Sequence, residues 1–418
     1  MLSTLKSAVK AEDTRKKILF TLMMFLVFRI GTHIPVPNIN SEVIHQLTEQ
    51  AKLLGFFDMI SGGAFKNFSI FAMSITPYIN ASIIMQLLTV IVPKLEQLAK
   101  EDRKKIAEYT RYLTVVLAFV QAIGVSFGFK GALVNTSIGS IALVALTLTA
   151  GTACLMWIGE LITEKGIGNG ISLIIFAGIV SRIPNGCLTL YSYIVEKGAI
   201  GVLVVLLFAV IALAAIVAVV AIQEGQRRIP VQYAKRVVGR KVYGGQSTHI
   251  PIKVNSAGVI PVIFAMSILM FPGTIASFFP NSGFAQTITN IFDASGIFYN
   301  ILYALLIVFF TYFYSAISFN PVDVAENIKK NGGFIPGLRP GRPTAEFISK
   351  ILSRITLIGA LFLAFIALVP IAYSAATGLR GLSMGGTSVI IIVGVVLETM
   401  KQVESMMVVR HYKGFLSD

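Results

Sequence analysis

Ten apolar segments separated by polar loops are the feature that most constrains how this chain folds. A helix needs about 20 residues to cross the hydrocarbon core of a membrane, and most of these segments approach or exceed that length. A mean hydropathy of +0.78 excludes an ordinary soluble globular protein. The pattern therefore predicts an all-α polytopic membrane protein, with spans near Ile18–Pro35, Ile70–Val92, Tyr109–Phe129, Ile138–Ile158, Ile171–Ile183, Ile200–Ile222, Ala257–Phe278, Ile297–Ser318, Ile351–Tyr373 and Ser383–Leu397.

One further apolar stretch, Phe56–Ser69, is too short to cross the membrane. It contains Gly62-Gly63 and two charged residues, Asp58 and Lys66. Non-helical backbone is tolerated at membrane depth only where protein or a water-filled cavity surrounds it. We therefore expect a re-entrant segment that enters and leaves on the same side.

The segment Gln223–Ser256 is long, polar and basic, with seven Lys or Arg residues and one acid. A loop that only reverses the chain needs a few residues, whereas this one has room for a β-hairpin. Lys241–Thr248 is typical of a strand that runs into a Gly-Gly turn. A basic topology loop explains the charge, but the length favours a docking surface for a soluble partner.

Basic residues also predict the orientation. If the N-terminus is cytoplasmic, cytoplasmic segments hold 28 of the 35 Lys and Arg residues, which favours N-in and C-in topology. Two halves of five spans must then have opposite topology, as in an inverted repeat. The expected division is 1–222 for spans one to five and the first helix of the second half, 223–256 for the docking loop, and 257–418 for the C-terminal half, with a second cytoplasmic loop at 320–350 and a tail at 401–418.

The sequence contains little that would indicate an enzyme. No GxxxxGK[ST] or HExxH motif occurs, the four histidines are scattered, and no Asp or Glu lies inside a span. Gly166–Gly170 is expected to be a turn into the fifth span. We expect Cys154 and Cys187 to be buried free thiols and Arg29 to extend toward the membrane interface. The sequence predicts no cofactor and no metal site.

The spans do contain β-branched residues close to helix breakers. Ile75 and Ile79 lie one helical turn apart around Pro77, Ile175 and Ile179 repeat that spacing, and Ile263 follows a proline in the seventh span. In any one helix, such a pair is commonly ordinary packing. Periodicity alone does not make these residues a site.

Several longer stretches resemble the SecY family, which forms the large subunit of the protein-conducting channel. They are distributed over the whole chain, and they are Gly55–Gln86, Gly166–Val180, Gln226–Val237, Gly258–Ala265, Gly333–Ala345 and Gly385–Val393. The loop Pro93–Glu108 departs from the family pattern because it is shorter. The resemblance implies ten transmembrane helices in two inverted five-helix halves around a central pore, with a short re-entrant plug helix.

The resemblance also implies the roles of particular residues. A ring of apolar side chains would close the pore at mid-membrane, formed by Ile75, Ile79, Ile175, Ile179, Ile263 and Ile391. The plug would include Phe57, Ile60, Gly62, Gly63 and Phe65. A lateral gate would lie between spans two and three and spans seven and eight, where Gln86 and Gln121 either hold the gate shut or make ordinary interhelical hydrogen bonds.

Partners follow from the same resemblance. They would be small membrane subunits of the SecE and SecG type, the SecA motor ATPase, the ribosome, polypeptides with signal sequences, and lipid. The expected docking residues are Arg227, Arg228, Lys235, Arg236, Arg240, Lys241, Arg339 and Arg342. The chain would then pass unfolded polypeptides across the plasma membrane and release membrane segments sideways into it.

Two other classes remain as alternatives. A secondary transporter for a small solute also uses inverted repeats and broken helices, but it predicts a polar site at mid-membrane. A membrane scaffold needs neither a constriction nor glycines in a re-entrant segment.

Overall fold

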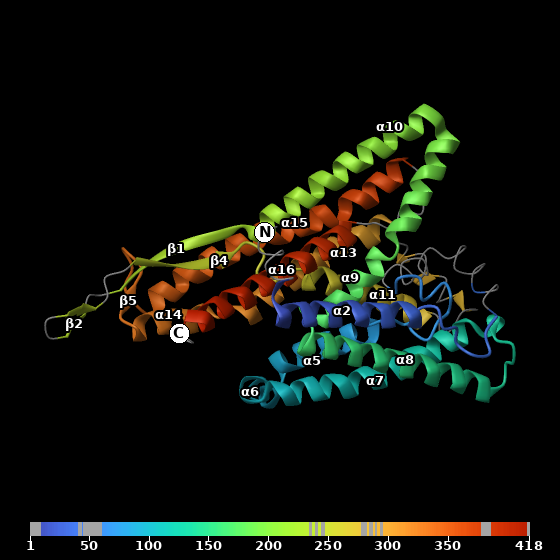
Figure 1. Ribbon diagram of the computed structural model, residues 1–418, viewed down its shortest axis with the longest axis horizontal. Helices are drawn as coiled ribbons and strands as arrows, with labels where there is room; N and C mark the ends of the chain where they lie inside the picture. Colours follow the sequence, from blue (N-terminus) through green and yellow to red (C-terminus); the bar gives the residue numbers. More distant parts are fainter. Residues whose placement is uncertain are drawn as a thin grey trace.

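The computed structural model describes residues 10–40, 44, 61–233, 236–238, 241–243, 247–276, 282–283, 287–288, 291–292, 296–377 and 386–415. Its helices pack side by side into an elongated bundle, and one long helix, α10, leans away from the others (Figure 1). Strands lie at one end of the bundle.

The first part of the chain supplies five helices, with α8 in contact with the other four. They are α2 (Glu12–Gly31), α5 (Thr76–Ile91), α7 (Arg103–Gly128), α8 (Ile138–Lys165) and α9 (Gly170–Val180). Helix α8 packs against α7, α9 and α2, while α5 packs mainly against α7. The Asn169 side chain caps α9 by accepting hydrogen bonds from the backbone nitrogens of Ile171 and Ser172, at 3.1 and 3.3 Å. The glycine run Gly166–Gly170 is thus the turn that the sequence predicted.

Helix α10 (Ile183–Glu224) bends sharply at Gly198, where φ is 58° and ψ is −132°. A positive φ suits glycine because residues with a β-carbon rarely adopt it. Its two arms meet at the apex visible in Figure 1. The second arm contains the predicted sixth span.

The second part of the chain adds four more long helices, α11 (Ile260–Ala276), α13 (Ile297–Ser318), α15 (Arg342–Thr377) and α16 (Gly386–Phe415). Helix α13 packs between α11 and α15, and α16 contacts α9, α10 and α15. Helix α11 also contacts α5 and α7 of the first part. The two parts therefore meet along two seams, α11 with α5 and α7, and α16 with α9.

The basic loop forms an extended β-hairpin. Strand β1 (Gln226–Tyr233) pairs antiparallel with β4 (Ser247–Lys253), and β5 (Gly333–Phe334) pairs with the other edge of β1. Strands β2 (Arg236–Val238) and β3 (Lys241–Tyr243) continue the hairpin. Their register pairs Arg236 with Tyr243 and Val238 with Lys241. The predicted turn at Gly244-Gly245 lies outside the described residues.

Two short helices accompany the hairpin at this end of the molecule (Figure 1). Helix α14 (Pro321–Lys330) packs on α15 and β5, and α6 (Pro93–Glu101) continues from α5 after a bend of 108°. Buried Ile229, Val231 and Ile252 of the hairpin pack in one cluster with residues of α14 and α15. The hairpin is thereby anchored on α14 and α15.

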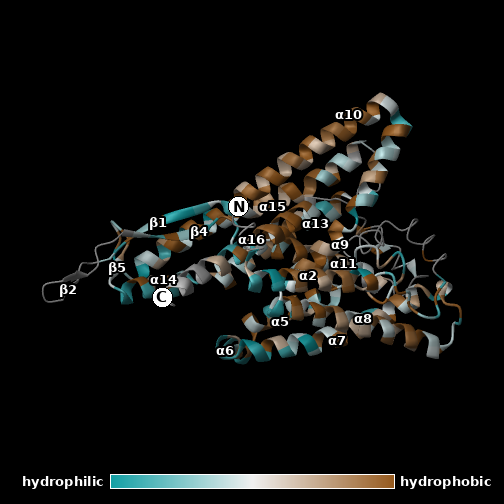
Figure 2. Ribbon diagram, in the orientation of Figure 1, coloured by the Kyte–Doolittle hydropathy of each residue, from teal (hydrophilic) through white to brown (hydrophobic). Residues whose placement is uncertain are grey.

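Each of the ten predicted spans overlaps a helix. In the described part of the chain, five helices are long and apolar enough to cross a membrane by themselves, or six if bent α5 and α6 count as one. The predicted number of ten spans is consistent with these helices. Figure 2 shows that the hydrophobic residues follow the helical bundle and that the hairpin end is more hydrophilic.

Two expectations need correction. The predicted second span, from Ile70, becomes helical only at Thr76, because residues 70–75 form turns. Cys154 and Cys187 are free, as predicted, but both are exposed. In a membrane protein an apolar, exposed position faces lipid, so a thiol in an apolar helix need not be buried in protein.

Candidate functional site

The six predicted ring residues occupy one hydrophobic cluster at the centre of the bundle. Five of them are buried, with exposed fractions of 6% or less, and Ile263 packs against the same cluster. They come from both parts of the chain: Ile75, Ile79, Ile175 and Ile179 from the first, Ile263 and Ile391 from the second. The fold thus brings together residues separated by more than 300 positions in the sequence.

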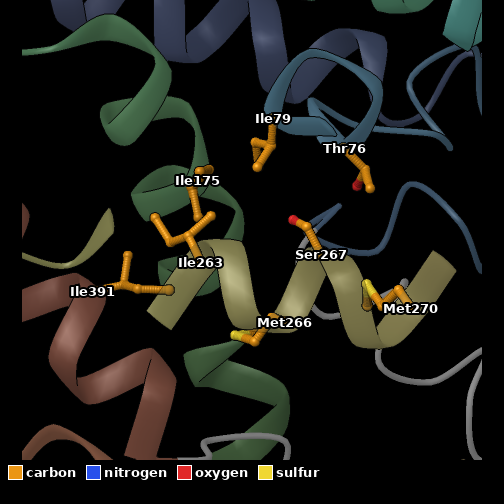
Figure 3. Close-up of a pocket in the computed structure, with 8 residues that line it drawn as sticks. All are labelled: Thr76, Ile79, Ile175, Ile263, Met266, Ser267, Met270 and Ile391. Atoms are coloured by element: carbon orange, nitrogen blue, oxygen red, sulfur yellow. The ribbon is translucent and has the colours of Figure 1, made fainter. Parts of the chain in front are cut away.

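Four of the isoleucines face one small cavity (Figure 3). Ile79 comes from α5, Ile175 from α9, Ile263 from α11 and Ile391 from α16. The space between them is about 10 Å³, of the order of one water molecule. Ile75 and Ile179 do not line it but pack in the surrounding cluster.

Four other residues line this cavity, and the sequence reasoning missed all of them: Thr76, Met266, Ser267 and Met270. The last three lie three, four and seven positions after Ile263, so they share its face of α11. That spacing was visible in the sequence. It gave no signal because methionine and serine do not stand out in an apolar helix.

The lining of the cavity determines what it can do. Its eight residues carry two hydroxyl groups and no charge, so nothing in it can bind an ion strongly or exchange protons near neutral pH. A narrow apolar constriction excludes water and ions by dewetting. Aliphatic side chains also form no strong bond to a polypeptide that passes between them.

The segment Ser61–Ile75 packs beside this constriction. Gly62 and Gly63 both have positive φ values, 66° and 92°, as expected for the flexible glycine pair. Phe65 is buried in a second hydrophobic cluster, together with Phe68 and Phe129. The other two predicted plug residues, Phe57 and Ile60, lie outside the described residues.

The two predicted gate glutamines lie on helices that contact α11. Gln121 is buried on α7. Gln86 is half-buried on α5, and its Oε1 atom is buried without a hydrogen-bond partner in the described structure. Their role in gating remains a prediction.

The predicted docking residues lie at the hairpin end. Arg227 and Arg228 are exposed on β1, and Arg339 and Arg342 are exposed between β5 and the start of α15. Arg342 pairs with Glu346, with its Nε atom 3.2 Å from Oε1. Lys235 and Arg240 lie outside the described residues, as do the side chains of Arg236 and Lys241.

Solved structures share this fold. One, described as "The structure of a protein conducting channel", has a TM-score of 0.66 at 20% identity and covers 94% of this chain and 92% of its own. Another, "Sec61 in the Canine ribosome-channel complex from the endoplasmic reticulum", has a TM-score of 0.61 at 18% identity and covers 94% and 92%. At these identities the likeness shows the architecture alone.

Sequence comparison reaches further. The family model for SecY matches residues 69–400. The protein translocase subunit SecY of Halalkalibacterium halodurans is 50% identical over 100% of both chains, and that of Bacillus subtilis is 47% identical over 100% of both. Together with the shared fold and the central constriction, these matches show that the chain belongs to the SecY family.

Proposed function

We propose that this chain is the central, pore-forming subunit of a protein translocation channel. It passes unfolded secretory polypeptides across the membrane and releases membrane segments sideways into lipid. The observation that carries this proposal is the convergence of isoleucines from α5, α9, α11 and α16 on a cavity of about 10 Å³. A seal of this kind blocks ions at rest and widens without losing strong bonds when a chain enters.

The same site argues against a solute transporter. A transporter holds its solute or coupling ion with polar or charged groups near the membrane midplane. The cavity is lined instead by aliphatic and thioether side chains with two hydroxyls. A polypeptide varies in sequence along its length, so a lining without specific bonds suits it better.

The sideways exit lies along the seam between α11 and the pair α5 and α7. These helices belong to different parts of the chain and meet beside the constriction. Gln86 and Gln121 lie on the α5 and α7 side of this seam. Interhelical hydrogen bonds in membranes contribute only about 0.6 to 2 kcal/mol each, so a bound signal helix can offset their loss.

The driving force comes from partners, because the chain itself has no catalytic role in this proposal. A motor ATPase of the SecA type or the ribosome docks on the hairpin and the second loop, where exposed Arg227, Arg228 and Arg339 offer guanidinium groups to carboxylates or phosphates. Small membrane subunits of the SecE and SecG type complete the channel.

The hairpin end faces the cytoplasm in this proposal, with both termini on that side. The excess of Lys and Arg residues in the segments that flank this end supports the orientation. The bacterial relatives support a location in the bacterial plasma membrane.

A crosslink tests the proposal directly. In a chain with Cys154 and Cys187 replaced by Ser, an Ile79→Cys variant is combined with a secretory polypeptide that carries one cysteine and is stalled midway across the membrane. We expect a disulfide that depends on the signal sequence. Ile301→Cys is the matched control, because Ile301 is 58% exposed on α13 and faces away from the cavity.

The contrary outcome is equally clear. If the stalled chain is engaged but crosslinks to Ile301→Cys and not to Ile79→Cys, the path does not pass through the constriction. The pore assignment would then be wrong.

A further inference from the structure

Within the described residues, hydrogen bonds join the segment that contains Gly62 to neighbouring elements near Phe68 and at Gly62, and these two attachments differ in kind. At its far end, the backbone nitrogen of Val36 donates to the Phe68 carbonyl at 2.9 Å, and the nitrogen of Ile70 donates to the Ile34 carbonyl at 3.0 Å. These bonds form a short antiparallel bridge to the chain that follows α2. They do not depend on any side chain.

The near end is held by side chains instead. Arg29, on the last turn of α2, donates from Nη1 to the Gly62 carbonyl at 3.0 Å. Ser181, just after α9, lies with its Oγ 3.3 Å from the same oxygen and 2.7 Å from the Gly178 carbonyl. One carbonyl of the segment is thus bound by donors from two different helices.

Close backbone contact completes this attachment. A β-carbon at Gly62 would lie 2.8 Å from the Cα atom of Gly178, so only two glycines allow the segment to approach α9 this closely. Helix α9 also carries Ile175 and Ile179 of the constriction, and Ile179 is two residues before Ser181. A shift of α9 that widens the constriction must therefore disturb the contacts to Gly62.

We propose that Arg29 and Ser181 form a latch on the Gly62 carbonyl. This latch holds the plug segment, Ser61–Ile75, in the closed position, and it is released when α9 moves. The bridge at Phe68–Ile70 is the fixed end about which the segment swings. The inference rests on the proposed channel function, and it assigns to Arg29 a role beyond the interfacial position that its sequence context predicted. Both residues position the plug and do not contact the passing polypeptide.

Substitution of Arg29 tests the latch alone, because the backbone of Arg29, and not its side chain, makes the hydrogen bonds at the end of α2. The Arg29 carbonyl accepts from Thr32 Oγ1 at 2.7 Å and lies 3.0 Å from His33 Nδ1, so Arg29→Gln leaves the end of α2 intact. Arg29→Lys keeps a charged donor, and Ser181→Ala removes the second contact. Lys130→Gln is the matched control, since Lys130 is an exposed cation on the same side of the proposed membrane orientation.

The reporter is the thiol of an Ala64→Cys variant in the full chain, with Cys154 and Cys187 replaced by Ser. Ala64 is 0% exposed and lies between the two attachments. Intact cells are treated with a membrane-impermeant thiol reagent in the absence of substrate. We expect Arg29→Gln to raise the modification rate about tenfold, the effect of losing one charge-assisted hydrogen bond, while Ser181→Ala raises it less.

A second reporter separates release of the plug from general loosening of the protein. Ala276→Cys lies at the end of α11 and is 5% exposed. It should stay unreactive in every variant, Arg29→Lys should restore most of the protection at Ala64→Cys, and Lys130→Gln should change neither reporter.

Two results would overturn the latch. One is an unchanged rate at Ala64→Cys in both Arg29→Gln and Ser181→Ala, and the other is an equal rise at Ala276→Cys. Neither result affects the signal-dependent crosslink at Ile79→Cys, so failure of the latch can be distinguished from failure of the proposed function.

Discussion

Isoleucine suits the constriction because it is bulky and apolar, and because branching at Cβ restricts its rotamers. Asparagine is smaller, is not branched at Cβ and brings an amide that holds water. We therefore expect Ile79→Asn or Ile391→Asn to wet the cavity, raise the ion leak of reconstituted vesicles, and let polypeptides with weakened signal sequences pass. Ile138→Asn is the control, since Ile138 is 87% exposed at the start of α8. An unchanged leak with unchanged signal selectivity would count against the ring.

Gly151 shows how closely a single residue fixes the plug segment. A β-carbon at this position would overlap the Ile70 carbonyl, so Gly151→Ala must displace backbone. We expect it to lower the free energy of unfolding by about 1 to 3 kcal/mol, as overpacking does. Gly139→Ala is the matched control in the same helix, because its nearest neighbour, Ser137 Oγ, is 3.9 Å away. Thermal unfolding in detergent compares the two, and equal midpoints would contradict the packing argument.

At the scale of elements, hydropathy located the helices well and their limits poorly. Residues 70–75 are as apolar as a span, yet they form turns, because buried non-helical backbone is satisfied by neighbouring protein. The bend at Gly198 and the pairing of Val238 with Lys241 depend on backbone angles and strand register, which an apolar pattern does not specify.

The residues of the constriction were identified in two different ways. Its residues were found by resemblance, whereas Met266, Ser267 and Met270 needed the tertiary packing of α11 against α5. The spacing of these residues placed them on one face of the helix. It did not say which face meets the pore.

The loop between β5 and α15 allows a test of docking at the same scale. Gly337 and Gly341 adopt positive φ, and the Arg339 carbonyl accepts from Thr344 Oγ1 at 2.8 Å, so the backbone fixes the turn and the Arg339 side chain stays exposed. We expect Arg339→Glu to reduce motor-driven export of a secretory protein about tenfold or more, by replacing a favourable charge contact with a repulsive one.

The membrane level of the Arg339→Glu protein should stay normal, because the turn does not depend on this side chain. Lys130→Glu is the control for a general effect of charge reversal. Normal export by Arg339→Glu would remove the docking assignment for this residue.

At the scale of the whole molecule, the two seams differ in the bonds that hold them. Beside α9, the Gly168 nitrogen donates to Gln402 Oε1 of α16 at 2.7 Å. The seam of α11 with α5 borders the apolar cavity, where Thr76 and Ser267 are the only polar lining residues in the described structure. The α11–α5 seam can therefore part at lower cost than the α9–α16 seam.

A pair of cysteines across the weaker seam tests this motion. In the chain without Cys154 and Cys187, Thr76→Cys with Ser267→Cys can be bridged by a short bifunctional thiol reagent or by oxidation, because both residues line one cavity. We expect the bridge to block export and membrane insertion together, since both need α11 to separate from α5, and a reducing agent to restore the oxidised channel.

The matched control for that bridge is Glu224→Cys with Lys401→Cys. It replaces an ion pair of 2.7 Å between α10 and α16, which belong to the same half in the proposed division. Bridging this second pair should leave both activities unchanged, because α10 and α16 need not separate for the α11–α5 seam to open. Full export through a channel with Thr76→Cys bridged to Ser267→Cys would mean that α11 and α5 stay together, and that polypeptides pass without separation of the two halves.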